Sequence, residues 1–266
     1  MKLPKNFPHL INFIIWGFIS AGLIFYLLQG SNPPAGYLSI FKNDSSYQPQ
    51  SQDRSLIESA AIQPAQTSES ELESLPQKIL NPAPFVPQAP FANWDQLHEE
   101  ACEEAVIITA HYYLRDQKNI SKQKAEEEIL KMIQYQEKNF NGHHDLDAEH
   151  IVKLAREFYN DQYQIKKEFT QNDIKKYLAR KTIIIVPAAG RVLENPNFKQ
   201  PGPLYHALVI IGYDEKKQQF ITNDPGTRKG SEFRYSYKNL MQSIHDFPGK
   251  KEQILQGEKI IILVEK

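Results

Sequence analysis

Three side chains from distant parts of the sequence, Cys102, His206 and Asp224, have the chemistry needed for thiol-dependent acyl transfer. A cysteine thiolate attacks carbonyl carbons and forms a covalent intermediate. A histidine can take up and return a proton near neutral pH, and a hydrogen-bonded carboxylate fixes the tautomer of its ring. The question for the sequence is whether its helices and strands bring these three groups together.

Cys102 is the only cysteine, and it lies at the start of an apolar helical pattern over residues 101–114. A helix N-terminus stabilises a thiolate. Glutamates at 99, 100, 103 and 104 would oppose ionisation if they pointed inward. Adjacent helical residues diverge by about 100°, so Glu103 at least can face solvent. The alternative is that Cys102 is a small buried hydrophobic residue without a chemical role.

His206 begins the apolar run 206–213, and Asp224 follows the next apolar run, 219–222. Two hairpin registers are open. If Gly212 pairs with Gln218, Asp224 lies directly opposite His206, within hydrogen-bonding reach. If Tyr213 pairs with Gln218, Asp224 faces Ala207 and points to the other side of the sheet unless a bulge intervenes.

Gln88 precedes the cysteine helix in a loop bounded by prolines 87 and 90. Its carboxamide NH2 is a suitable donor to the oxyanion that forms in acyl transfer, together with the backbone N–H of the nucleophile. His98 is a weaker candidate for the base, because no carboxylate outside its own helix is evident as its partner. A run rich in histidine and aspartate matches no compact zinc motif, and its aspartates suit helix capping, so no metal is expected; it comprises His143, His144, Asp145, Asp147 and His150.

The apolar periodicity changes midway along the chain. Helical patterns cover 101–114 and 121–134, with Ser121 as N-cap, and further helices begin after Asp147 and after the Thr170–Asp173 capping box. Short β-branched runs follow at 182–187, 207–213, 219–222 and 259–264, with a short helix over 236–245. Helices followed by strands predict an α+β fold with a mostly antiparallel sheet.

Three blocks of sequence resemble the peptidase C39-like family: VPQAPFANWD with EACEEA, then HALVIIGYD, then NDPG. The resemblance covers residues 85–266 and implies a papain-like cysteine peptidase fold. It implies that Cys102 is the nucleophile, His206 the base, Asp224 the residue that orients His206, and Gln88 the oxyanion donor. Bacteriocin-leader proteases of the wider group usually have Asp-Cys-Gly where this chain has Ala-Cys-Glu, so cleavage after a double-glycine leader is not expected.

The N-terminal part predicts a membrane anchor. Residues 10–28 contain no charge and would span about 30 Å as a helix, roughly one hydrocarbon core. A cleaved signal peptide is the alternative, but its apolar stretch is usually shorter and a suitable cleavage site is missing. Lys2 and Lys5 keep the N-terminus cytoplasmic under the positive-inside rule.

The predicted organisation is therefore a cytoplasmic N-terminus at 1–9, a single-pass anchor at 10–29, a disordered extracytoplasmic linker at 30–84 and a peptidase-like domain at 85–266. The linker is rich in Ser, Gln, Pro and Glu and has few apolar residues to offset the entropy of ordering.

Composition excludes several classes of protein. The 31 basic and 32 acidic residues give a net charge of -1, so the basic excess of a nucleic-acid-binding protein is missing. A single cysteine excludes intrachain disulfides and cysteine-based zinc sites. No cofactor is expected, and the expected partners are the membrane and a peptide or protein substrate.

The sequence thus favours a membrane-anchored extracytoplasmic cysteine peptidase that cleaves a peptide or amide bond. Two alternatives stay open: a binding or scaffold domain with an idle triad, and an acyl transferase that uses the same nucleophile.

Overall fold

The computed structural model describes residues 75–266. The predicted N-terminal tail, the anchor at 10–29 and most of the predicted linker lie outside the described residues. Within residues 75–266, no helix is both long and apolar enough to cross a membrane.

A seven-stranded sheet forms the centre of the described part of the chain. Its strand order is β2-β7-β3-β4-β5-β6, and β1 pairs with β4 outside this path. Every strand pair is antiparallel. The strands are β1 (Lys78–Leu80), β2 (Gln164–Lys166), β3 (Ile183–Ala189), β4 (Tyr205–Asp214), β5 (Gln219–Asn223), β6 (Phe233–Ser236) and β7 (Ile261–Val264).

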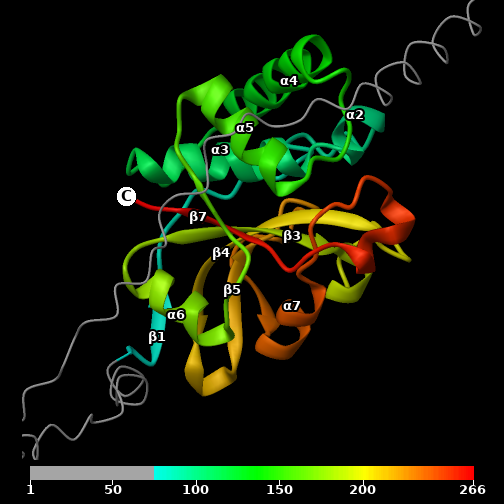
Figure 1. Ribbon diagram of the computed structural model, residues 1–266. Coiled ribbons are helices and arrows are strands. Elements are labelled where there is room, and N and C mark those ends of the chain that lie inside the picture. Colours follow the sequence, from blue (N-terminus) through cyan, green and yellow to red (C-terminus); the bar gives the residue numbers. More distant parts are fainter. Residues whose placement is uncertain (1–74) are drawn as a thin grey trace, which may run out of the picture. The chain divides into compact units, whose positions relative to one another are not determined.

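Helices cover both faces of this sheet (Figure 1). On one face lie α3 (Cys102–Leu114), α4 (Lys122–Asn139) and α5 (Ala148–Tyr159); on the other lie α6 (Gln171–Ala179) and α7 (Tyr237–Ser243). The short α2 (Gln96–Glu99) precedes α3. Alternating residues of β4 supply both cores, with Ala207 and Val209 packed toward α3 and Leu208 and Ile210 toward α6 and α7. The α+β class with a mostly antiparallel sheet is confirmed.

The predicted helix starts are confirmed by their caps. The Ser121 side chain accepts a hydrogen bond from the N–H of Lys124, and Asp147 accepts one from the N–H of His150. Thr170 and Asp173 form the complete reciprocal capping box at the start of α6. These caps satisfy backbone donors that a helix N-terminus leaves unpaired.

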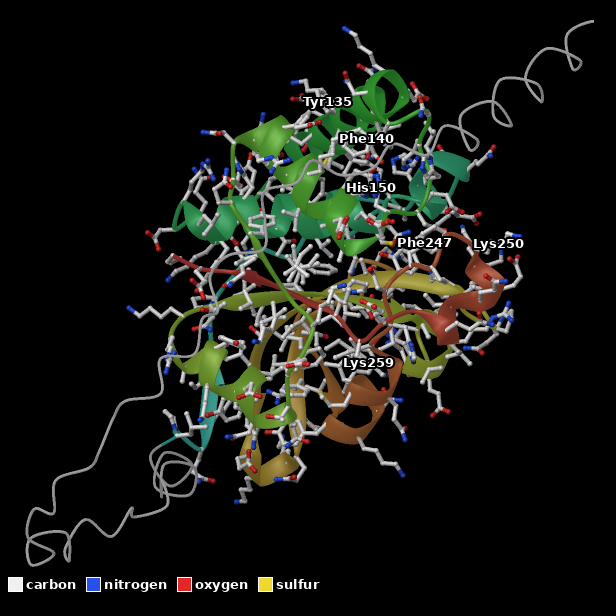
Figure 2. The ribbon with its side chains drawn as sticks, in the orientation of Figure 1. Tyr135, Phe140, His150, Phe247, Lys250 and Lys259 are labelled. Atoms are coloured by element: carbon white, nitrogen blue, oxygen red, sulfur yellow. The ribbon has the colours of Figure 1, made fainter. Side chains whose placement is uncertain are left out.

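Aromatic side chains join α4 to α5 in the helical layer. Figure 2 labels Tyr135 on α4, Phe140 just after it and His150 on α5. The Phe140 ring packs against both of the others, with ring centroids 6.3 Å from Tyr135 and 6.0 Å from His150. This packing connects the end of α4 to the first turn of α5.

The β4–β5 hairpin has neither of the two predicted registers. Asp214 pairs with Gln219, because β4 continues to Asp214 and the turn occupies the four residues that follow. The Asp214 side chain caps this turn, and Gln218 closes it in a left-handed conformation with φ 55°. A bulge between Ile210 and Gly212 then shifts the pairing by one residue.

The folded region begins earlier than the predicted boundary at residue 85. β1 pairs with the end of β4 beyond the part that β3 covers. The side chain of Asn81 is buried and donates to the carbonyl of Leu178 at 2.9 Å. The linker prediction is therefore wrong for residues 78–84, which belong to the sheet and its core despite their polar surroundings in the sequence.

Candidate active site

A cavity of about 970 Å³ opens between the start of α3 and the loops around β4 and β5. Cys102, His206 and Gln88 all line it, so three of the four predicted site residues share one cavity. Trp94 lines it as well and is 40% exposed.

Cys102 is the first residue of α3 and is only 4% exposed. Its sulfur donates a hydrogen bond to Oε2 of Glu103 at 2.9 Å. Burial raises the pKa of the thiol well above its ordinary value, and the nearby Glu103 carboxyl raises it further. The thiol is therefore protonated at neutral pH in this arrangement, despite its position at a helix N-terminus.

The side chain of Glu103 is buried beneath the segment between α4 and α5. The solvent-facing orientation that helical geometry allows is not adopted, because the side chain is 1% exposed. Its other oxygen, Oε1, accepts a hydrogen bond from the N–H of Leu146 at 2.7 Å. The segment between α4 and α5 folds over the first turn of α3 and encloses this side chain.

His206 and Asp224 are joined by a hydrogen bond in the core of the site. His206 Nε2 lies 2.8 Å from Asp224 Oδ1, and both side chains are almost completely buried. Burial alone would raise the pKa of the Asp224 carboxyl, but His206 and the hydrogen bonds to the carboxyl outweigh it and hold that pKa below its ordinary value. Since Asp224 is ionised and binds Nε2, Nδ1 is the ring nitrogen left for the cavity.

The bulge explains how this pair forms in an unexpected register. Val209 pairs with Asn223, so the next position puts Asp224 level with Leu208, two residues from His206. Residues two apart on a strand share a face, and such diagonal neighbours lie within reach of longer side chains. The predicted contact is present, although its predicted geometry is not.

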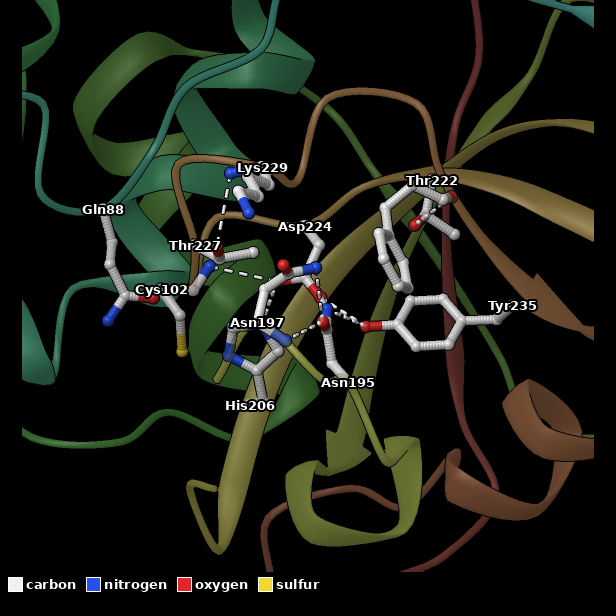
Figure 3. Close-up of polar contacts among 12 residues, drawn as sticks. Gln88, Cys102, Asn195, Asn197, His206, Thr222, Asp224, Thr227, Lys229 and Tyr235 are labelled. Atoms are coloured by element: carbon white, nitrogen blue, oxygen red, sulfur yellow. Dashed lines mark hydrogen bonds and ion pairs between the residues drawn. The ribbon is translucent and has the colours of Figure 1, made fainter. Parts of the chain in front are cut away.

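Asp224 has two further side-chain partners that sequence reasoning missed (Figure 3). Its Oδ2 accepts hydrogen bonds from Asn195 Nδ2 at 3.0 Å and from the Tyr235 hydroxyl at 2.5 Å. The N–H of Gly226 adds a third donor, to Oδ1. Tyr235 was missed because it lies on β6, a four-residue strand without a clear alternating pattern. Asn195 was missed because the Asn195-Pro196 pair indicates only a turn.

The imidazole of His206 is held on its faces as well as at its nitrogen. The ring of Phe198 packs edge-on against it, with centroids 5.2 Å apart. A side chain at position 226 would meet the ring, since a Cβ built on Gly226 lies 2.9 Å from Cε1 of His206. Glycine there lets the loop that follows Asp224 lie directly against the histidine.

Gln88 lies beside the cavity, but its amide group is already engaged. Nε2 donates to the carbonyl of His98 at 2.8 Å and to that of Glu99 at 3.2 Å. Its backbone N–H donates to the carbonyl of Pro225, which ties this loop to the Asp224 segment. Oε1 is buried and has no hydrogen-bond partner among the described residues. Donation to an oxyanion therefore requires the amide to release a carbonyl, and that role stays a prediction.

His98 is buried and has two carboxylate partners, contrary to the expectation that it has none beyond its own helix. Its Nδ1 lies 2.7 Å from Asp95 and its Nε2 3.1 Å from Glu126. It does not line the cavity, so it is not positioned to act on Cys102.

The residues of the histidine-rich run have structural partners. His143 lies 3.2 Å from Glu104, Asp145 lies 3.2 Å from Lys251, and Asp147 caps α5. Within residues 75–266, no group of three or more such side chains is arranged to hold a metal ion.

Replacing Tyr235 by phenylalanine is expected to lower the free energy of unfolding by about 1–3 kcal/mol, because the buried Asp224 carboxylate loses a donor. An aspartate whose pKa is lower in the folded state stabilises the fold above its unfolded pKa, and this contribution is lost as the pH falls through the folded pKa. The variant raises the folded pKa of Asp224, so acid unfolding should begin at a higher pH. Denaturant titrations over the acid range measure both effects.

Tyr135→Phe is the matched control, because its hydroxyl bonds the exposed Glu157 at 3.2 Å. That change should alter stability by at most about 0.5 kcal/mol. Equal acid stability of the two variants would contradict the assignment of Tyr235 as a support for the Asp224 carboxylate.

Comparisons with known proteins agree with the resemblance seen in the sequence. The model of the peptidase C39-like family matches residues 83–252. Two solved structures are similar: a C39-like peptidase from Bacillus anthracis (TM-score 0.43, 13% identity, 71% of this chain and 98% of that one) and xylellain, a cysteine protease from Xylella fastidiosa (TM-score 0.43, 12% identity, 75% and 90%). No curated protein matches significantly. Since the family model matches well over half of the sequence, this chain belongs to the peptidase C39-like family.

Proposed function

We propose that this protein is a cysteine peptidase that cleaves a peptide or amide bond with Cys102 as nucleophile, His206 as general base and Asp224 as the residue that orients His206. The observation that carries the proposal is the buried His206–Asp224 hydrogen bond of 2.8 Å in the wall of a cavity that Cys102 also lines. Membership of the peptidase C39-like family supports it.

The reaction would begin when the Cys102 thiol turns toward Nδ1 of His206 and gives up its proton. The sulfur forms a bond to the substrate carbonyl carbon, and the oxyanion receives hydrogen bonds from the Cys102 N–H and the Gln88 amide. His206 then protonates the departing amine as the C–N bond breaks. It next removes a proton from water, whose oxygen replaces sulfur on the acyl group.

The shape and lining of the cavity suit a peptide substrate. Its volume is at the upper end of the range for small-ligand sites, roughly 300–1,000 Å³. Trp94 and Phe198 provide apolar surface, while Lys199, Arg228 and Lys229 bring positive charge from the loops after β3 and β5. We further propose that residues 10–29 anchor this domain to the cell membrane with the active site outside the cytoplasm, as their apolar length suggests.

The test uses the fact that Cys102 is the only thiol. The full chain, in detergent, is incubated with a peptide library, and new termini are identified by mass spectrometry with and without prior alkylation by iodoacetamide. We expect cleavage that alkylation abolishes. A second arm adds a primary amine: amide products in place of free acids would indicate an acyl transferase. Absence of any product would favour the idle binding domain and overturn the proposal.

A further inference from the structure

The carboxyl group of Glu103 holds the nucleophilic sulfur from the residue next to it. Oε2 accepts the hydrogen bond of the Cys102 thiol at 2.9 Å, while Oε1 accepts the N–H of Leu146 at 2.7 Å. Both oxygens of a side chain that is almost wholly buried are thus committed, so the carboxyl cannot move without breaking a buried hydrogen bond.

The segment that anchors Glu103 is itself fixed to the strand that carries the histidine. The hydroxyl of Tyr205 donates to the carbonyl of Leu146 at 2.7 Å, and Tyr205 precedes His206 in β4. Backbone from Ala207, on the other side of His206, also approaches the Cys102 sulfur and favours its thiolate. Glu103 accepts the hydrogen bond of the thiol, and His206 must receive its proton. The two residues are therefore connected through the hydrogen bonds of Leu146 and Tyr205.

The groups around Glu103 are mostly acidic. Cys102 and Glu104 lie on its own helix, Asp145 on the segment before α5, and Tyr205 on β4. Two basic side chains lie one contact further away: Lys251 pairs with Asp145 and Glu100, and the His143 ring lies beside Glu104.

This environment disfavours negative charge beside the sulfur. Burial, followed by the charges of Asp145 and Glu104, raises the pKa of Glu103 well above its ordinary value. Burial and Glu103 raise that of Cys102 in turn. Negative charge on either group is therefore disfavoured by burial and by negative charge on its neighbours.

We propose that Glu103 is a positioning residue that keeps Cys102 in a resting orientation, with its thiol hydrogen-bonded to the carboxyl group instead of to His206. Among the described residues, the sulfur makes this hydrogen bond and none to His206. Activation breaks the S–H···O contact, and the same proton then passes from sulfur to Nδ1 of His206, with no oxidation or reduction. The inference rests on the proposed function, because it assigns a resting state to that nucleophile.

The test is Glu103→Gln, read as the pH dependence of Cys102 alkylation by iodoacetamide. Glutamine has the same size, and its oxygen still accepts the Leu146 N–H, but its NH2 group faces the sulfur as a donor. We expect the alkylation midpoint to move to lower pH. The rate near neutral pH should rise about tenfold for each unit by which the thiol pKa falls.

Glu104→Gln is the matched control, since Glu104 is equally buried on the same turn but bonds Gln136 and His143 instead of the sulfur. Its midpoint should move much less. A merely structural role for Glu103 would lower the melting temperature of Glu103→Gln without moving the midpoint. An unchanged or raised midpoint in a folded variant overturns the proposal.

Failure of this inference is distinguishable from failure of the proposed function. Alkylation reports on the thiol whether or not a peptide is cleaved, so an inactive protein would still show the Glu103→Gln shift. Conversely, peptide cleavage together with an unshifted alkylation midpoint in Glu103→Gln would support the proposed function and contradict only the proposed resting orientation. Glu103→Asp provides a second reading: its shorter carboxylate cannot bridge both partners, so its midpoint should also fall.

Discussion

Cys102→Ala, His206→Ala and the double variant are expected to hydrolyse a peptide substrate at the same residual rate. Removing a general base alone costs about 10²–10⁴-fold, and removing the nucleophile ends the covalent route altogether. Groups that act as one unit are strongly non-additive, so the second substitution should cost almost nothing once the first has been made. The measurement is kcat/KM for all three variants on a substrate found in the library screen.

The control for this set is His150→Ala. His150 is an exposed histidine on α5 whose hydrogen-bonding partner is Asp147, the cap of its own helix. It should retain the wild-type kcat/KM within about twofold, as expected for a surface substitution with an effect within about 0.5 kcal/mol. If His206→Ala kept more than half of the wild-type rate, or if the two single losses simply multiplied in the double variant, the assignment of one catalytic unit would be wrong.

Much of this site was predictable, because its candidate residues are of chemically distinctive types and lie at the ends of helices and strands that the sequence pattern predicts. The only cysteine begins a helical pattern, and His206 begins an unmistakable apolar strand. The next apolar run leads to Asp224, and Pro225 and Gly226 end the strand after it. Asp224 is therefore the last side chain of this strand that could contact His206. His206 and Asp224 meet even though both predicted registers were wrong, because a pleated strand puts residues two apart on the same face.

The protonation of Cys102 was not predictable in the same way. Helical geometry places Glu103 about 100° around the helix axis from Cys102, but it does not show what lies on that side. The segment before α5 supplies the Leu146 N–H, which donates a hydrogen bond to the Glu103 carboxyl group. Burial of this acid is a tertiary effect, so only the folded chain reveals that the thiol has a hydrogen-bond acceptor beside it.

The fold shows the same division between local and tertiary signals. Helices with side-chain caps and strands rich in isoleucine were predicted, because capping and β-branched patterns are local properties. β1, β2 and β6 were missed, and each has only three or four residues. Such short strands depend on the neighbouring strand for their stability, and no periodic pattern of their own identifies them.

β1 was missed for a further reason, since it follows a polar segment that reads as a linker. Its stability comes from β4, through the pairs of Lys78 with Asp214 and Ile79 with Tyr213. The hydroxyl of Tyr213 donates to the carbonyl of Pro76 at 2.6 Å, and the N–H of Asn81 donates to that of Ile211. Residues 76–81, which lie just before the predicted domain boundary at residue 85, thus contact the strand that carries His206.

Gly212→Ala is therefore expected to destabilise the domain by about 2–4 kcal/mol, within the range for overpacking and the loss of buried hydrogen bonds. A Cβ at this position would lie 2.2 Å from the carbonyl oxygen of Ile79 and 3.0 Å from Cα of Leu80. Both obstacles are backbone atoms, so no side-chain rotation relieves the clash and β1 must leave β4. Urea denaturation followed by circular dichroism measures the loss.

Gly249→Ala is the control that separates this contact from the general cost of replacing glycine. It meets no atom within 4 Å, although its φ of 88° is unfavourable for alanine. It should therefore cost about 1 kcal/mol through backbone strain alone. Equal destabilisation by the two variants would mean that β1 contributes little. A larger loss for Gly212→Ala, with faster hydrogen exchange at Ile211 and Tyr213, would show that the chain before residue 85 stabilises the strand that carries His206.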